Sequence, residues 1–283
     1  MSDLVSRSTD LPPDYYLSNF SFLLDWVWER YSDVLNDTER LFVQSFKQLD
    51  RDAQCLLVRL SSRKGPLFRR DKLHYPEIES LDFAARKLMD SGILLGDTPI
   101  HLNEVANVLT KVELLTLFPD QLIGMKQSRK EAIISALSLL FSEPKSWMTW
   151  TSNKFGTAYY LNNQSIISNL LLLFFGNAYQ NLTEFVLQDL GLFQYEDYVI
   201  DHQHRIFKSR DELEQYQQLI QLRELMEMDA SIDSLMQIAA ELPQVCVSEN
   251  LQRRREKLAN HLAYRLERSG EHLLAMQLYK QSN

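Results

Sequence analysis

The chain has 283 residues, with 30 Lys and Arg against 38 Asp and Glu and a formal net charge of −8 at pH 7. Its content of 45% hydrophobic and 24% charged residues is ordinary for a globular protein of one large or two smaller domains. The acidic balance argues against a protein that coats nucleic acid indiscriminately. It is compatible with a local basic face, because charges act over a Debye length of about 8 to 10 Å.

The small number of glycines and prolines, eight of each, predicts a mainly α fold with a few short strands. Cys55 and Cys246 lie far apart in apolar helical contexts, and residues 1–10 lack the apolar core of a signal peptide, so we expect a reducing, cytoplasmic location. The most apolar run, residues 166–176, is shorter than the about 20 residues that a membrane helix needs. We expect it to be a buried helix and expect no membrane contact.

The first predicted elements are helices. Residues 1–36 read as a loose arm followed by a packing helix whose apolar face includes Phe20, Leu23 and Val27. Asp37 or Thr38 is suited to cap the next helix, and Asp52 to cap a third, which Gly65-Pro66 would stop.

The segment after this stop is basic and irregular. The run RLSSRKGPLFRRDKLHYPEI, residues 59–78, contains six cations against Asp71 and Glu77, and its second half predicts one strand or hairpin. Ser80 is suited to cap a further helix that ends at Gly92, before a brief apolar strand at 93–95. This order of helices and short strands predicts a winged-helix-like module over residues 37–97.

The basic run has two interpretations. It is either a solvated loop or a surface that binds the nucleic-acid backbone, with Phe68 and Tyr75 placed to lie along a groove or beneath an unpaired base. No base-reading pattern is visible, so we expect recognition of shape rather than sequence. The predicted DNA contacts in this run are Arg59, Arg63, Lys64, Arg69, Arg70, Lys72 and Tyr75.

A second helical unit is expected over residues 98–145. Thr98-Pro99 would open it, and two amphipathic helices follow, the second of which begins at a Ser128–Glu131 capping box. Three cations would then surround a helix N-terminus, where backbone N–H groups favour an anion such as phosphate. These further predicted DNA contacts are Lys126, Arg129 and Lys130.

The remaining chain is predicted to be helical. Residues 146–225 form an apolar connecting region, with a short β-like piece before a helix capped by Ser209, and residues 226–283 resemble the start of tetratricopeptide-like helices. The arginines of residues 252–268 read as a solvated helix face rather than a second nucleic-acid site.

No catalytic centre is predicted. Asp120 with Glu143-Pro144-Lys145 matches the PD-(D/E)xK nuclease pattern formally, but Pro144 is unsuited to the rigid strand that this metal chemistry requires. His202 and His204 would share a strand face near Asp197 and Asp201, although no third soft ligand supports a metal site. No phosphate-binding or nucleophile motif occurs either.

Four segments together resemble the N-terminal half of the Fanconi-anaemia-associated nuclease family in its bacterial form. They are PPDYYLSNFSFLLDWV, LLVRLSSRKGPLFRRDKLHYPEI, ALSLLF and TEFVLQDLGLFQYEDYVIDHQHRIFKSRDELEQY, in this order. The resemblance implies a winged-helix-like region and a SAP-like helix pair that grip branched or flap DNA, followed by tetratricopeptide-like helices. The basic run maps onto the first module, and Lys126, Arg129 and Lys130 map onto the SAP-like helix pair.

The resemblance also implies a 5′-flap endonuclease and 5′-to-3′ exonuclease, a phosphodiesterase I that acts in interstrand crosslink repair with Mg²⁺ or Mn²⁺. Its catalytic VRR-NUC domain follows the N-terminal half, so no catalytic residue, metal ligand or cofactor is assigned to this chain, and we expect it to be inactive alone. The expected partner is branched or flap DNA, with nucleoid association when bound. The competing hypothesis is a protein-interaction scaffold, in which protein partners bind the helical repeats.

Overall fold

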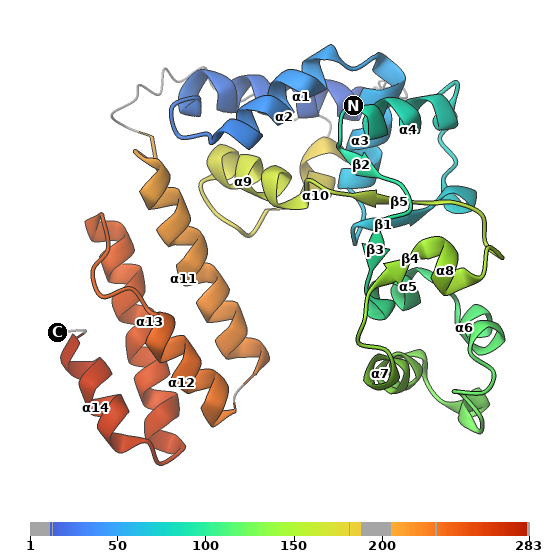
Figure 1. The fold of residues 1–283 in the computed structure, drawn as a ribbon. Helices are drawn as coiled ribbons and strands as arrows, with labels where there is room; N and C mark the ends of the chain where they lie inside the picture. Colours follow the sequence, from blue (N-terminus) through green and yellow to red (C-terminus); the bar gives the residue numbers. More distant parts are fainter. Residues whose placement is uncertain (1–11, 13, 181, 188–204, 230, 282–283) are drawn as a thin grey trace, which may run out of the picture. The chain divides into compact units, whose positions relative to one another are not determined.

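The computed structural model describes residues 12, 14–180, 182–187, 205–229 and 231–281. These residues are mainly helical with a few short strands, which confirms the predicted fold class (Figure 1). They fall into two compact units, the first made of residues 1–29 and 37–198 and the second of residues 30–36 and 199–283. The predicted N-terminal arm lies almost entirely outside the described residues, as do His202, His204 and most of the β-like piece.

The first unit contains ten helices among its described residues, two 3₁₀ turns and five strands. The helices are α1 (Tyr15–Tyr31, which ends in the second unit), α2 (Asp37–Gln48), α3 (Arg51–Ser61), α4 (Leu81–Asp90), α5 (Leu102–Val108), α6 (Lys111–Leu117), α7 (Lys130–Leu140), α8 (Trp147–Thr151), α9 (Gln164–Phe175) and α10 (Leu182–Leu187). The 3₁₀ turns are η1 (Arg70–Lys72) and η2 (Met125–Gln127), and the strands are β1 (Leu67–Arg69), β2 (Leu94–Leu95), β3 (Pro99–Ile100), β4 (Lys145–Ser146) and β5 (Ala158–Leu161).

Two of the predicted N-cap residues in this unit have different outcomes. Ser80 caps α4 by accepting from the N–H of Phe83, as expected. Asp50, rather than Asp52, caps α3. Asp52 lies in the first turn of α3 and accepts instead from the backbone N–H groups of Glu79 and Ser80, at 2.9 and 3.3 Å, so it joins α3 to the start of α4.

A three-stranded antiparallel sheet has the order β1-β5-β2, with β5 in the middle. The strands at 67–69 and 94–95 confirm the two predicted β segments, but the middle strand comes from residues 158–161, in a region predicted to be helical. The chain therefore leaves the sheet after β2, forms α5 to α8, and returns to pair with both earlier strands (Figure 1).

The two faces of this sheet carry different neighbours, because successive strand side chains alternate between faces. Leu67 and Ala158 share one face and belong to an apolar cluster with residues of α5, α7 and α8, such as Val105, Ile133 and Trp150. Tyr159 lies on the other face, where its hydroxyl is 3.5 Å from Asp82 of α4. The sheet thus separates the winged-helix-like module from the SAP-like helix pair.

The SAP-like helix pair begins differently from its prediction. Pro99 lies in β3, which pairs with β4, and α5 begins only at Leu102. The predicted Ser128–Glu131 capping box does not form, because Arg129 is the N-cap residue of α7 and makes no side-chain cap hydrogen bond. The turn before it uses Gly124 at φ +81°, a conformation that favours glycine.

The second unit contains α11 (Arg210–Met228), α12 (Ile232–Glu241), α13 (Glu249–Arg268) and α14 (His272–Gln281). Ser209 caps α11 as predicted. Arg255 is almost fully buried and donates to the carbonyl of Pro243 at 2.5 Å and to Gln281, so it joins α13 to both flanking segments. The tetratricopeptide-like character of these helices stays a prediction. Within the described ranges, no helix is long and apolar enough to span a membrane.

Candidate nucleic-acid interface

The C-terminus of α3 presents the first cations of the basic run. The hydroxyls of Ser61 and Ser62 donate to carbonyls one turn earlier in α3, and Gly65 at φ +85° turns the chain toward β1. Arg63 and Lys64 occupy the tip of this turn and are exposed. The tip is therefore held by local hydrogen bonds and a glycine turn while its charges face solvent.

Arg59, one turn before the tip, is held by a buried acid. Its guanidinium lies 2.6 Å from Glu77, whose side chain is only 3% exposed, and Tyr16 donates to the same carboxylate oxygen at 2.8 Å. Burial alone would raise the pKa of Glu77, but its own backbone N–H, Tyr16 and Arg59 hydrogen-bond to the carboxylate and lower that pKa. Arg59 is therefore already paired with an acid of the protein itself.

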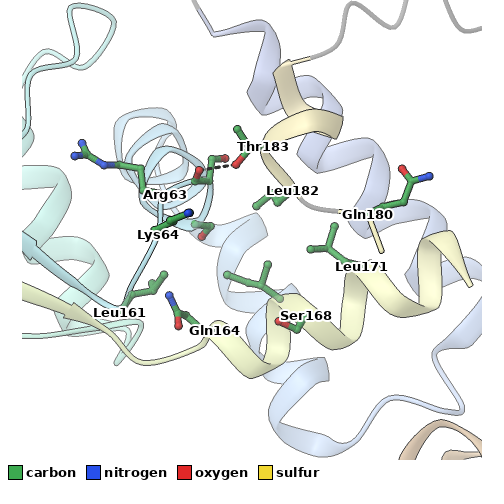
Figure 2. A pocket seen from close by; sticks show the side chains of 12 residues that line it. Arg63, Lys64, Leu161, Gln164, Ser168, Leu171, Gln180, Leu182 and Thr183 are labelled. Atoms are coloured by element: carbon green, nitrogen blue, oxygen red, sulfur yellow. Dashed lines mark hydrogen bonds between the residues drawn. The ribbon is translucent and has the colours of Figure 1, made fainter. Parts of the chain in front are cut away.

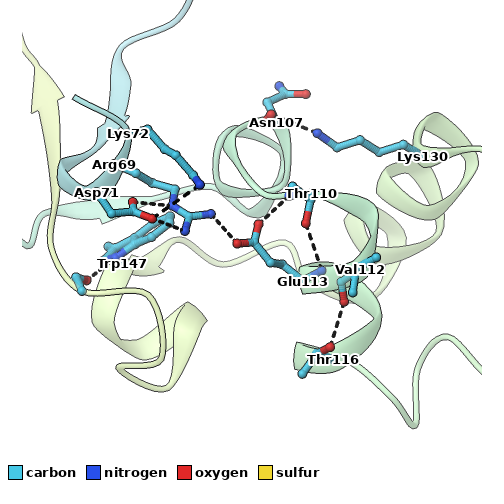
Figure 3. A network of polar contacts seen from close by, with 11 residues as sticks. Arg69, Asp71, Lys72, Asn107, Thr110, Val112, Glu113, Thr116, Lys130 and Trp147 are labelled. Atoms are coloured by element: carbon cyan, nitrogen blue, oxygen red, sulfur yellow. Dashed lines mark hydrogen bonds and ion pairs between the residues drawn. The ribbon is translucent and has the colours of Figure 1, made fainter. Parts of the chain in front are cut away.

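Arg69 is the most deeply buried cation of the run, with a side chain that is 4% exposed. It makes two hydrogen bonds to Asp71, at 3.0 and 2.8 Å, and a third to Glu113 of α6 at 2.7 Å (Figure 3). Its guanidinium also lies 5.0 Å from the centre of the Phe155 ring. The structure therefore places Arg69 at the joint between sheet and SAP-like helix pair, and a direct DNA contact stays a prediction.

Arg70 points to the opposite side of the module from Arg69. It contacts both oxygens of Asp82 in α4, at 2.5 and 3.1 Å. The hydrogen bonds from Arg70 lower the pKa of Asp82. This pair is partly exposed, so solvent weakens the attraction between its charges. Arg70 can bind an outside anion only if its contact with Asp82 weakens.

The remaining members of the run are more open. Lys72 is exposed and lies 3.8 Å from Asp71, and Arg63 donates to the hydroxyl of Tyr75 at 3.2 Å. Phe68, in contrast, is 4% exposed, so the expectation that it lies beneath an unpaired base is wrong in this structure. The sequence could not distinguish these cases, because acid partners such as Glu113 lie 44 positions away from their arginine.

Arg63 and Lys64 line two neighbouring hollows. The smaller, of about 160 Å³, also includes Lys72, with Phe68, Leu73 and Val108 as apolar walls. The larger, of about 630 Å³, continues over β5, α9 and α10, and its amide side chains are Gln164 and Gln180 (Figure 2). The hydroxyl of Thr183 donates to the carbonyl of Ser62 at 2.6 Å and so attaches α10 to the tip. Three exposed cations therefore surround concave surface on which an anionic backbone can lie.

The second predicted group lies around η2 and the start of α7. Lys126 and Arg129 are exposed, whereas the ammonium of Lys130 donates to the carbonyl of Asn107 at 3.0 Å and joins α7 to α5 (Figure 3). Two of the three cations thus face solvent near the first turn of α7, where N–H groups point outward. The Ser128 box that was expected to fix this turn is replaced by the glycine turn at Gly124.

No alternative chemistry gains support among the described residues. They contain no group of three or more His, Cys, Asp or Glu side chains that could hold a metal ion. Lys145 lies in β4 directly after Pro144, and its ammonium is 4.9 Å from the Trp150 ring centre rather than near a carboxylate pair. Cys55 is buried and Cys246 half-buried, and both are free thiols. The two histidines and two aspartates considered as metal ligands in residues 197–204 lie outside the described residues.

Fold and site together define a mainly helical protein with a helix-turn-helix module, a SAP-type helical region and further helices. Residues 14–95 match the family model "FAN1, HTH domain", and residues 99–150 match "Fanconi anemia-associated nuclease SAP domain". The chain thus matches the N-terminal half of the Fanconi-associated nuclease family, as the four sequence segments predict.

Known relatives match most of the chain. A Fanconi-associated nuclease 1 homolog of Pseudomonas aeruginosa is 36% identical over 98% of this chain and 49% of its own length. The Fanconi-associated nuclease 1 of Homo sapiens is 30% identical over 71% of this chain and 23% of its own length. This chain therefore spans half or less of these relatives.

Solved structures agree as well. The crystal structure of paFAN1 bound to 5′-flap DNA with a 2-nucleotide flap and a gap superposes with a TM-score of 0.85 and 35% identity, over 96% of this chain and 49% of that one. A second paFAN1 complex, with a 1-nucleotide flap, gives a TM-score of 0.83 over 96% of this chain and 50% of that one.

Proposed function

We propose that this chain binds branched DNA, in particular 5′-flap DNA, by shape and phosphate charge, as the N-terminal part of a DNA-repair nuclease. The observation that carries the proposal is the match of almost the whole fold to a protein crystallised with 5′-flap DNA. The exposed cations of the tip support it, because Arg and Lys side chains that neutralise phosphates supply most of the sequence-independent affinity for DNA.

The proposal assigns different roles to the predicted contacts. Arg63, Lys64 and Lys72 would contact phosphates directly, because all three are exposed around the two hollows. Lys126 and Arg129 would form a second contact on the SAP-like helix pair. The ion pairs of Arg59, Arg69 and Arg70 would shape the surface, with at most a secondary share in phosphate contact.

The test is a titration of fluorescent 5′-flap DNA with the protein over a range of salt concentrations. Affinity should fall steeply as salt rises, and the double substitution Arg63→Ala with Lys64→Ala should weaken binding at low salt. It should also reduce the slope of log affinity against log salt by about 0.9 per lost phosphate contact. Flap affinity that is undetectable at low salt would sink the proposal and favour the protein-interaction scaffold.

A matched control removes two charges from the second unit. Arg253 and Lys257 are exposed on α13, so Arg253→Ala with Lys257→Ala makes the same change in net charge as the tip variant. Binding and salt slope should then stay close to those of the wild type. If both variants weaken binding equally, net charge rather than the tip determines affinity.

The finer features of the family enter as part of the same proposal. A nuclease domain of the VRR-NUC type, with Mg²⁺ or Mn²⁺, would supply cleavage of the bound DNA, and the setting would be interstrand crosslink repair at the nucleoid. Tetratricopeptide-like helices in the second unit would link DNA binding to that domain. Incubation of this chain with flap DNA and Mn²⁺ should leave the DNA intact, and cleavage that Glu143→Ala abolishes would contradict this division of roles.

A further inference from the structure

Two glutamates of the SAP-like helix pair each use their two carboxylate oxygens for different purposes. In Glu113, Oε2 accepts from the N–H of Thr110 at 2.7 Å and caps α6, while Oε1 accepts from Arg69 of β1. In Glu104, Oε2 accepts from the N–H of His101 at 3.2 Å and caps α5, while Oε1 accepts from the hydroxyl of Tyr160 in β5 at 3.2 Å. Each helix start is therefore hydrogen-bonded to a strand.

The two strands involved are neighbours in the same sheet. Leu67 of β1 pairs with Tyr160 of β5, and Arg69 pairs with Ala158, so Arg69 and Tyr160 project from the same face. That face is the one that contacts the apolar cluster of α5, α7 and α8. The joint thus combines non-directional apolar packing with two directional polar contacts.

Apolar packing alone leaves freedom for small rotations of one module on the other, whereas a guanidinium that is hydrogen-bonded on both sides is tightly oriented. Arg69 makes two parallel hydrogen bonds to Asp71, stacks near Phe155 and donates its remaining edge to Glu113 (Figure 3). Burial opposes ionisation of Glu113, but the hydrogen bonds from Thr110 and Arg69 keep its pKa lowered, so it is charged near neutral pH.

We propose that Arg69 is a positioning residue that, through Glu113, fixes the angle between the winged-helix-like module and the SAP-like helix pair, and that this angle sets the preference for branched over linear DNA. The inference rests on the proposed function, because it assumes that each module contacts a phosphate backbone. A fork presents two backbones at a defined angle, so the two modules must be held at a matching angle to contact both. A linear duplex is bound by either module alone. Loss of the angle therefore affects branched DNA selectively.

The test uses Glu113→Gln in the full 283-residue chain. A glutamine still accepts at a capping box, so α6 keeps its cap while the ion pair to Arg69 is lost. Affinities for a 5′-flap junction and for a linear duplex of equal length are measured over the same series of salt concentrations. The flap-to-duplex ratio should fall severalfold while duplex affinity and its salt slope hold. Glu131→Gln is the control, because Glu131 is exposed on α7 and its substitution makes the same charge change.

A second measurement reports the angle without DNA. Spin labels at Asp90→Cys on α4 and Ser138→Cys on α7, in a chain with Cys246→Ser, give an inter-label distance distribution by pulsed electron spin resonance. Both positions are exposed, and Cys55 is buried. Glu113→Gln should broaden or shift the distribution, and Tyr160→Phe, which removes only the second polar contact, should broaden it less. Glu131→Gln should leave it unchanged.

The outcomes separate the two claims. An unchanged distribution with an unchanged flap-to-duplex ratio overturns the inference. A changed distribution with an unchanged ratio overturns the link to DNA preference. If the wild-type chain itself shows no preference for flap DNA, the proposed function and the specificity claim both fail, and the distance distribution alone then decides whether Arg69 positions the modules.

Discussion

Arg59 and Lys47 form ion pairs of the same length, 2.6 Å from nitrogen to oxygen, but the pairs differ in burial. Glu77 beside Arg59 is 3% exposed, whereas Lys47 and its partner Asp25 are each about half exposed. Removal of Arg59 leaves a buried carboxylate without its cation, so Arg59→Ala should lower the free energy of unfolding by about 3 kcal/mol. Lys47→Ala should cost about 1 kcal/mol or less. Urea unfolding followed by circular dichroism measures both.

The comparison isolates burial from distance, since the pairs have equal lengths. Equal costs for the two variants would show that burial of Glu77 does not govern the pair. If adding Glu77→Gln to Arg59→Ala recovers the lost free energy of unfolding, the uncompensated carboxylate is the cause of that loss.

Buried acids also predict an acid-sensitive fold. The pKa values of Glu77 and Glu113 are lowered in the folded state, so each contributes stability that is complete above its unfolded pKa, about 4.3, and is lost as pH falls through the folded pKa. The urea midpoint should therefore be steady near neutral pH and fall below about pH 4.5, and Glu77→Gln should flatten that fall. A midpoint independent of pH between about 3 and 7 would contradict it.

The candidate site could be predicted from sequence only in part. The clustering of cations, the break at Gly65-Pro66 and the exposed tip at Arg63 and Lys64 are local properties, and local properties are readable in one sequence. Which cation is already paired depends on contacts such as Arg69 with Glu113, which the fold brings together from distant positions. The nearby Asp71 is the one local feature of the sequence that indicates an acid partner for Arg69.

At the scale of helices, two positions test whether a capping residue in the sequence determines where a helix starts. Asp50 accepts from the N–H of Ala53 at 2.9 Å, so Asp50→Ala should lower the free energy of unfolding by about 1 kcal/mol. Ser128 lies before the N-cap position of α7, which makes no side-chain cap bond, so Ser128→Ala should change stability very little. Thermal unfolding of both variants checks this. A cost at Ser128 as large as at Asp50 would restore the capping box that sequence reasoning predicts there.

Helices were predictable because apolar residues at helical spacing and capping residues mark them locally, as Phe20 to Val27 and Ser80 show. Strand β5 was not, because its four residues, AYYL, form a strand only by pairing with β1 and β2, which lie far earlier in the chain. Its apolar and aromatic content fits a helix equally well in isolation. The error at residues 158–161 thus follows from a long-range cause.

At the scale of the first unit, β5 has two consequences. It completes the sheet of the winged-helix-like module, and it makes that sheet the common wall for the SAP-like helix pair. The segment from β3 to α8 is in effect an insertion between β2 and β5. Helix α9 adds a further contact beyond β5, because Asn169 donates to the buried Glu39 of α2 at 2.6 Å. The winged-helix-like module therefore depends on elements that lie well beyond residue 97, namely β5 and α9.

This dependence predicts how fragments behave. A fragment of residues 1–97 contains β1 and β2 but not the strand that lies between them, so both would be unpaired edges over an open apolar core. It should show little cooperative thermal unfolding and poor dispersion of amide signals in nuclear magnetic resonance spectra. A fragment of residues 1–187 contains β5, α9 and α10 and should unfold cooperatively. The direct control is Ala158→Pro in the longer fragment, which places a proline in the middle strand and should reduce cooperativity toward that of the short fragment. Cooperative unfolding of residues 1–97 alone would show that the module folds without its middle strand.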